Sequence, residues 1–114
     1  DRRLAADEQA QDVGLEHRAP LLRVAVETSR LTIEAARDCF GPMSQIREYA
    51  RLIDNNESLG DRLEQELISR LFAEPISAGE KLLEKEFVVA IGHLCDLCEH
   101  SKDQLMIWSV KRQL

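Results

Sequence analysis

The chain has 114 residues, of which 44% are hydrophobic and 32% are charged, and these values suit one domain with a modest core. Only five glycines, three prolines and five aromatic residues occur beside many Leu, Ala, Glu and Arg, which favours helices over a sheet. A net charge of −6, with the basic residues scattered, argues against binding to nucleic acid or to anionic membrane surfaces.

The sequence also bears on where the protein acts. No apolar run is long enough to span a bilayer, and no basic segment followed by an apolar one opens the chain. Three cysteines cannot all pair within one chain, and Cys95 and Cys98 fall inside a helical pattern, which suits a reducing compartment. We therefore expect a cytoplasmic protein without membrane insertion.

The first part of the chain predicts an arm followed by a helix. Residues 1–19 are polar, and we expect a short helix or a disordered arm there. Pro20 suits the first turn of a helix from 20 to about 40, which Gly41, as a left-handed cap, and Pro42 would end. The predicted apolar face of this helix comprises Leu21, Leu22, Ala25, Val26, Thr32, Ile33, Ala36, Cys39 and Phe40.

Two further helices are predicted at about 43–72 and 77–112. Pro75 separates them, and Ser77 with Glu80 forms a capping box for the last helix. The predicted buried residues of that helix are Leu83, Phe87, Ala90, Ile91, Leu94, Leu97, Cys98, Leu105 and Trp108. Three amphipathic helices with short links predict an all-α, antiparallel three-helix bundle over 20–114.

Four carboxylates of the second predicted helix are candidates for metal binding. Asp54, Glu57, Asp61 and Glu64 lie within one side of the helix, at the edge of its apolar face. Their mutual repulsion would be offset by a cation such as magnesium, calcium, manganese or iron. The alternative is that the acids face water or pair with nearby arginines, namely Arg47, Arg51 and Arg62. Gly60, in mid-helix, favours close approach of another backbone or a ligand.

The third predicted helix carries histidine, cysteine and acidic residues. Cys95 and Cys98 project away from His93 and His100, so we expect buried thiols rather than a Cys/His zinc site. A stripe on the other side could offer mixed oxygen and nitrogen ligands, or could be ordinary polar surface. Its members are Glu86, His93, Asp96 and His100.

Residues from Leu52 to Arg112 resemble the closing half of a PhoU-like protein of the Pit-accessory branch, which is associated with phosphate transport. The matching features are Glu57-Ser-Leu-Gly-Asp61-Arg-Leu-Glu64, then Arg70-Leu-Phe before a Pro/Ser linker, then Ile91-Gly-His-Leu-Cys-Asp-Leu-Cys-Glu99. The first resembles the family's Glu/Asp-x-x-x-Asp motif, and the last resembles its Ile-Gly-Asp-x-x-Asp-x-x-Glu pattern.

The resemblance implies three-helix bundles, usually two per chain, with acidic motifs on two helices that hold iron or zinc clusters. Glu57 and Asp61 match the first motif, and Asp96 and Glu99 match the end of the second. Val89 and His93 stand where the family places an acid pair, so we expect a single, weakly held ion instead of a cluster. The predicted metal ligands are Glu57, Asp61, Asp54, Glu64, His93 and Asp96.

The leading hypothesis is a non-enzymatic, PhoU-like accessory or regulatory protein of phosphate transport that binds Mn, Fe, Zn or Mg. Its expected partners are a phosphate transporter or its signalling kinase, and a second copy in a homodimer. The alternative is a helical interaction module whose acids bind no metal. An enzyme is disfavoured, since no activated nucleophile, phosphate loop or Glu-x-x-His pair is present.

Overall fold

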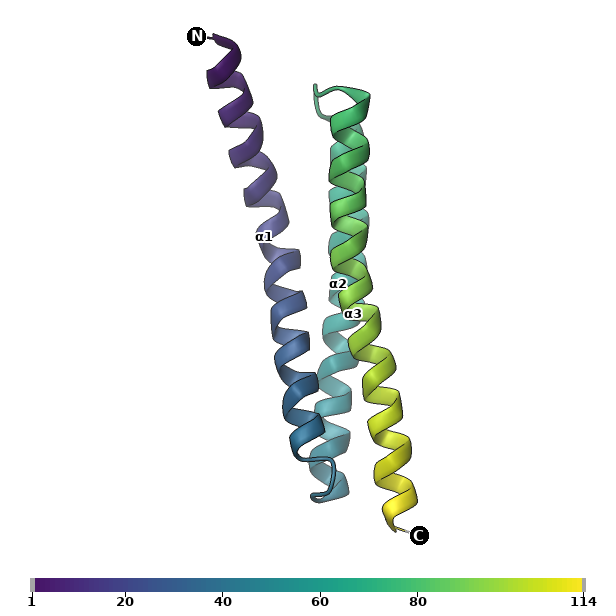
Figure 1. The fold of residues 1–114 in the computed structure, drawn as a ribbon. Coiled ribbons are helices and arrows are strands. Elements are labelled where there is room, and N and C mark those ends of the chain that lie inside the picture. Colours follow the sequence, from purple (N-terminus) through teal and green to yellow (C-terminus); the bar gives the residue numbers. More distant parts are fainter. Residues whose placement is uncertain (1, 114) are drawn as a thin grey trace.

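The computed structural model describes the backbone of residues 2–113 and the side chains of residues 17–113. Three helices, α1 (Arg2–Arg37), α2 (Met43–Ala73) and α3 (Ala78–Gln113), form a rod with extents of 66 × 19 × 15 Å (Figure 1). Successive helices run in opposite directions, so α1 and α3 are parallel to each other. This arrangement confirms the predicted all-α three-helix bundle, and the described part of the chain contains no strand.

The first helix starts much earlier than predicted. α1 begins at Arg2, and Pro20 lies inside it instead of in its first turn. The residues before Pro20 are rich in Ala, Leu, Glu, Gln and Arg, which all propagate a helix well. Proline removes only its own N–H from the hydrogen-bond ladder, so the helix can continue through it at some cost. From Arg2 onward, the predicted separate arm is therefore part of α1.

The link between α1 and α2 is a turn with ordinary backbone angles. The prediction of a left-handed cap at Gly41 is wrong, because no glycine in the described chain has a positive φ. The Gly41 N–H instead donates to the Asp38 carbonyl at 2.8 Å, which closes the turn. Pro42 then precedes α2 as its N-cap residue, where its missing N–H costs nothing.

The link between α2 and α3 follows the prediction. α2 ends at Ala73, just before Pro75, and the Glu74 N–H donates back to the Leu71 carbonyl. The Glu80 N–H donates to Ser77 Oγ at 3.2 Å, which confirms Ser77 as the cap of α3. Both links therefore hold neighbouring helices antiparallel with only a few residues.

The core has two apolar clusters along the rod. One is formed by Leu31, Ala35, Cys39, Ile46, Ile53 and Leu105. The other is formed by Leu21, Ala25, Val88, Ile91 and Cys95. All three helices contribute, so burial of these side chains supplies much of the free energy that holds the helices together.

The predicted apolar faces of α1 and α3 are only partly buried. Six predicted core positions are buried, but most of the others are exposed. The buried ones are Leu21, Ala25, Cys39, Ile91, Cys98 and Leu105. The exposed ones are Leu22, Val26, Ile33, Ala36, Phe40, Leu83, Phe87, Ala90, Leu94, Leu97 and Trp108. Each of these helices carries two adjacent apolar stripes, and a three-helix bundle buries only one of them. The other stripe faces outward.

Candidate metal centre

Three carboxylates converge where α2 crosses α3. Glu57 and Asp61 come from successive turns of α2, and Asp96 comes from α3. One oxygen from each of the three lies within 4.8 Å of the others, with Glu57 half-buried and the other two exposed. Carboxylates four residues apart share a helix face, so α2 presents its pair together to α3. These oxygens could share one cation.

The effects of burial and of neighbouring acids are clearest at Glu57. Burial, the adjacent carboxyl of Asp61 and then Glu99 raise the pKa of Glu57 from 4.5 to about 7. Near neutral pH this carboxyl is therefore partly protonated. A bound cation would remove the repulsion and displace the proton.

Arginines do not neutralise the cluster. Arg51, one of the predicted partners, binds Glu48 instead, with N–O distances of 3.1 and 2.5 Å. Among the described residues, no ion pair joins an arginine to Glu57 or Asp61. The predicted pairing with arginines is therefore not seen for Glu57 and Asp61, whereas the other alternative, exposure to water, agrees with the exposed position of Asp61.

Glu64 extends the acidic cluster along α2. Its pKa is raised by burial and by Asp61 and Asp96, while His93 acts in the opposite direction. Its carboxylate lies over Gly92 of α3, where an added Cβ would be 2.2 Å from Glu64 Oε2. The absence of a side chain at Gly92 thus lets Glu64 reach the backbone of α3.

His93 lies at the edge of the cluster. Its Nδ1 is 3.9 Å from Asp96 Oδ2, and the side chain is exposed. This distance is too long for a hydrogen bond, but one side-chain rotation could bring the ring nitrogen towards an ion held by Asp96.

Asp54 is separated from the other acids by its own partner. Lys102 Nζ lies 2.7 Å from Asp54 Oδ1 and 2.6 Å from Asp103 Oδ1. Lys102 is buried, so its ammonium is held in place between the two carboxylates. The structure therefore does not bring Asp54 together with Glu57, Asp61 and Asp96, and Asp54 already has a cation.

Glu99 was missing from the predicted ligand set, although the second acidic motif contained it. Its carboxylate is one of the neighbouring groups that raise the pKa of Glu57. It lies three residues after Asp96 on α3, so both can face α2. The spacing of Asp96 and Glu99 was the available signal, and the missing information was which face of α3 meets α2.

The structure also tests the predictions for Gly60 and for the two cysteines of α3. Gly60 is buried, and a Cβ added there would lie 3.5 Å from Cys95 Sγ and 3.7 Å from Val24 Cγ1. Helices approach closely at Gly60, as predicted, but without excluding a methyl group. Cys95 and Cys98 are buried free thiols while His93 and His100 are exposed, so the four do not surround one ion.

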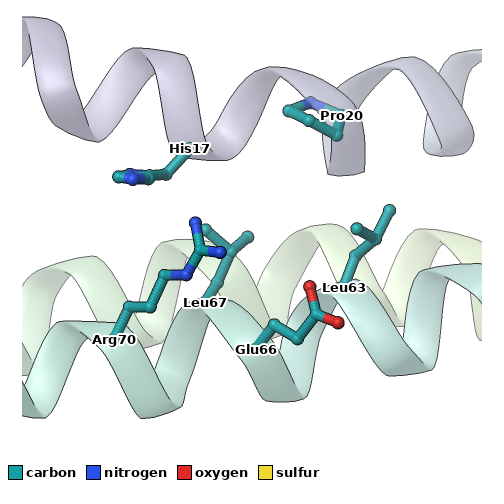
Figure 2. Close-up of a pocket in the computed structure, with 6 residues that line it drawn as sticks. All are labelled: His17, Pro20, Leu63, Glu66, Leu67 and Arg70. Atoms are coloured by element: carbon teal, nitrogen blue, oxygen red, sulfur yellow. The ribbon is translucent and has the colours of Figure 1, made fainter.

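A separate pocket of about 370 Å³ lies between α1 and α2 (Figure 2). Leu63, Leu67 and Pro20 form its apolar part, and His17, Glu66 and Arg70 border it. None of these residues belongs to the acidic cluster. Among the described residues, oxygen ligands that could share an ion converge at the α2–α3 crossing and not at this pocket.

Comparison with known proteins gives one informative match. The chain is similar to UPF0111 protein PH1389 of Pyrococcus horikoshii, with 31% identity over 65 residues. The match covers 56% of this chain and 31% of the relative, so the chain spans about a third of that protein's length. No protein-family profile and no solved structure matches. Within the described residues, none of the helices combines the length and apolar character needed to cross a bilayer.

Proposed function

We propose that this chain is a PhoU-like accessory or regulatory unit of phosphate transport that binds a divalent or iron-group cation and has no catalytic activity. The similarity to a UPF0111 protein, whose family is PhoU-like, supports the family part of the proposal. The three-helix bundle is the architecture that the resemblance implies. The proposed setting is the cytoplasm, with a phosphate transporter or its signalling kinase as partner.

The observation that carries the metal part is the meeting of Glu57, Asp61 and Asp96, to which no lysine or arginine among the described residues is paired. Three carboxylate oxygens suit hard cations, so Mn²⁺, Fe²⁺ and Mg²⁺ fit well, and Zn²⁺ fits if His93 joins. Glu64 and Glu99 are close enough to add oxygens or to orient the ligands. Asp54 is left out because Lys102 holds it.

Calorimetric titration of the apo protein with Mn²⁺, Fe²⁺, Zn²⁺ and Mg²⁺ tests the metal part. The expected result is one site per chain that Glu57→Gln weakens at least about 10-fold and that Asp54→Asn leaves unchanged. Absence of saturable binding by any of these ions would remove the metal from the proposal.

The transport part needs a cellular test. Deleting the gene from its host is expected to change the uptake of labelled phosphate, and the wild-type gene should restore it. The Glu57→Gln variant should restore it only in part if the metal matters. Unchanged uptake after deletion would contradict a role in phosphate transport.

A second candidate function is a helical interaction module without metal. It is favoured by the many large apolar side chains that α1 and α3 expose. This version expects association that a chelator does not alter, which light scattering with and without EDTA would measure.

A further inference from the structure

α1 and α3 each carry an outer apolar stripe beside the stripe that is buried in the core. On α1 the outer stripe is displaced by one residue towards the C-terminus, so that buried Ala25 is followed by exposed Val26. On α3 it is displaced by one residue towards the N-terminus, so that buried Cys98 is preceded by exposed Leu97. The large members of both stripes form what we call the outer face and are 36–69% exposed. They are Leu22, Val26, Ile33, Phe40, Leu83, Phe87, Leu94, Leu97 and Trp108.

The opposite displacements turn the two stripes towards each other. α1 and α3 run parallel, and a step of one residue is a rotation of about 100° around a helix. Contacts at both ends of the stripes agree with this arrangement. The Arg18 guanidinium carbon lies 5.0 Å from the centroid of the Phe87 ring, and that of Arg112 lies 5.3 Å from the centroid of Phe40. The outer face is therefore one surface along the α1–α3 pair.

The outer face lies on the side of this pair that is away from α2. Residues displaced in the other sense from each buried stripe are the ones that meet α2. On α1, Val24 lies next to Gly60 of α2, and on α3, Gly92 lies against the Glu64 carboxylate. The acids of α3 that contribute to the acidic cluster or bind Lys102 share this α2 side, so they do not border the outer face.

The spacing of both stripes is that of a coiled-coil seam, with alternating steps of four and three residues. On α1 the seam is Leu22, Val26, Ser29, Ile33, Ala36 and then Phe40 just after the helix. On α3 it is Leu83, Phe87, Ala90, Leu94, Leu97, Ser101, Gln104 and Trp108. Small residues stand between large ones in both seams, and such positions form the holes that receive side chains of a packed helix. A further helix along both seams would complete a four-helix bundle.

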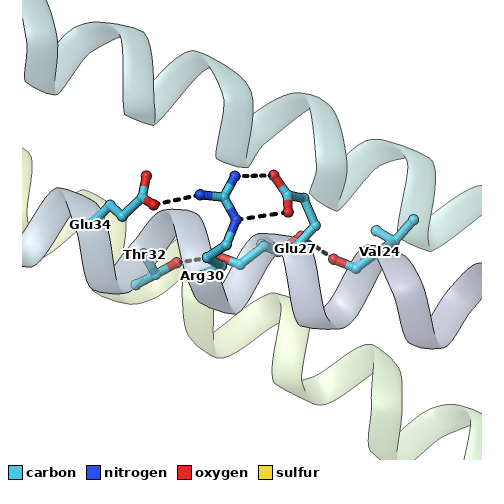
Figure 3. A network of polar contacts seen from close by, with 6 residues as sticks. Val24, Glu27, Arg30, Thr32 and Glu34 are labelled. Atoms are coloured by element: carbon cyan, nitrogen blue, oxygen red, sulfur yellow. Dashed lines mark hydrogen bonds and ion pairs between the residues drawn. The ribbon is translucent and has the colours of Figure 1, made fainter.

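A row of arginines borders the outer face on α1. Arg23, Arg30 and Arg37 are seven residues apart, and each directly follows a seam position. Arg30 is paired with Glu27, with N–O distances of 2.9 and 2.5 Å, and with Glu34 (Figure 3). Within the part of the chain whose side chains are described, Arg23 and Arg37 form no ion pair. These two arginines leave the α1 border positive.

The rest of the outer face adds little negative charge. The border positions on α3, each directly before a seam residue, are Glu86, His93, His100 and Ile107. Lys111 and Arg112 add positive charge at the end where Arg112 stacks on Phe40. A chain with a net charge of −6 thus has a locally basic border beside an apolar surface. Such a surface attracts an acidic partner.

We propose that the outer face binds one amphipathic helix of a partner protein, whose apolar residues follow heptad spacing and whose flank towards α1 is acidic. The two parallel seams with holes between large side chains fit a helix. A second copy of this chain would bring to the arginine row either another arginine row or the α3 border with Glu86 as its acid, so it supplies little complementary charge. The inference rests on the interaction-module function proposed above and names its partner, and it does not use the acidic cluster.

Two designed peptides test the proposal on the full chain. Each has three heptads with leucine at both seam positions, and one carries glutamate along one flank where the other carries lysine. Fluorescence anisotropy, at concentrations where the peptides alone are monomeric, measures their binding. We expect one glutamate peptide per chain, bound at least about 10-fold more tightly than the lysine peptide. The net charge of −6 alone would favour the lysine peptide, so this order tests the local border.

Variants of the chain locate the binding surface. Val26→Glu combined with Leu97→Glu should weaken the glutamate peptide at least about 10-fold, while the helical circular dichroism is retained. Phe72→Glu, an equally exposed apolar position on α2, should leave its affinity unchanged. Arg23→Glu combined with Arg37→Glu should reverse the preference, so that the lysine peptide binds more tightly.

Several results would overturn the proposal. One is that neither peptide binds, and another is that the lysine peptide binds the wild-type chain at least as tightly as the glutamate peptide. Sedimentation of the chain with anionic phospholipid vesicles, abolished by the Val26 and Leu97 changes, would assign the outer face to a membrane. A dimer that the same changes dissociate would assign it to a second copy. Metal titration does not depend on these outcomes, so the metal proposal can stand or fall separately.

Discussion

Two acidic groups lie on the same α2–α3 groove and differ in one respect. Asp54 and Asp103 share the ammonium of Lys102, at 2.7 and 2.6 Å. Glu57, Asp61 and Asp96 converge one to two turns away with no lysine or arginine partner among the described residues, although the His93 ring lies near Asp96. The first group shows how this bundle stabilises acids between two helices with its own cation. The second has no such ammonium among the described residues, and it is the group to which we propose that a cation from solution binds.

Removing the internal cation should have the largest effect on stability. In Lys102→Met, Asp54 and Asp103 face each other across the groove without an ammonium between them. Since both acids remain about half exposed, we expect a loss of about 1–3 kcal/mol in the free energy of unfolding. Urea denaturation measures it, and Lys85→Met, at an exposed position, is the control. A loss no greater than that of the control would show that Lys102 is not a structural counter-ion.

The next largest effect is expected on Mn²⁺ affinity, when one acid is substituted in each of the two groups. Glu57→Gln removes a ligand from the group that lacks a cation, and we expect at least about 10-fold weaker Mn²⁺ binding. Asp54→Asn removes an acid that Lys102 already neutralises, so Mn²⁺ affinity should change less than about two-fold. Equal losses in both variants would mean that the two groups do not differ as the structure indicates.

The pH dependence of stability should distinguish the groups further. The folded state holds a proton on Glu57 with a pKa of about 7, above its usual 4.5, because of burial and neighbouring acids. Between these values the folded state binds more protons than the unfolded one, so the free energy of unfolding of the apo protein should fall as pH rises. Thermal melts should show this fall, Glu57→Gln should reduce it, and saturating Mn²⁺ should oppose it. A pH profile unchanged by Glu57→Gln would contradict it.

The smallest expected effects concern the two mid-helix glycines. Gly60→Ala places its Cβ in ordinary contact and should stabilise the protein by up to about 1 kcal/mol. Gly92→Ala forces the Glu64 carboxylate away from α3 and should weaken Mn²⁺ binding a few-fold. The same substitution is thus made at two glycines. Gly60 packs against Cys95 and Val24, and Gly92 lies against the Glu64 carboxylate. Tighter binding in Gly92→Ala would show that Glu64 does not support the ion.

Much of the fold could be predicted from sequence because its signals are local. Pro42 and Pro75 interrupt helices through their backbone, Ser77 caps α3 through its side-chain hydroxyl, and the second link follows the prediction closely. The start of α1 could not be predicted, because the effect of Pro20 depends on whether the residues before it propagate the helix. The predictions of the buried faces of α1 and α3 were only partly correct, for another reason. Each helix has two adjacent apolar stripes, and only packing decides which one is buried.

The candidate site likewise has a part that could be predicted from local sequence and a part that depends on how the helices pack. Glu57 and Asp61 are four residues apart, so their proximity follows from helix geometry alone. Asp96 joins them from another helix, which the motif resemblance indicated and periodicity did not. Asp54 belongs to the same stripe of α2 but meets Lys102, which lies far away in the sequence. Such long-range pairing is set by the register between α2 and α3, and no local pattern reports it.

The most direct measurement is anomalous scattering from crystals of the full chain grown with Mn²⁺. We expect one strong peak coordinated by oxygens of Glu57, Asp61 and Asp96, and none between Asp54 and Asp103. A cluster that stays empty at saturating Mn²⁺, or a peak located at Asp54 and Asp103 instead, would contradict it.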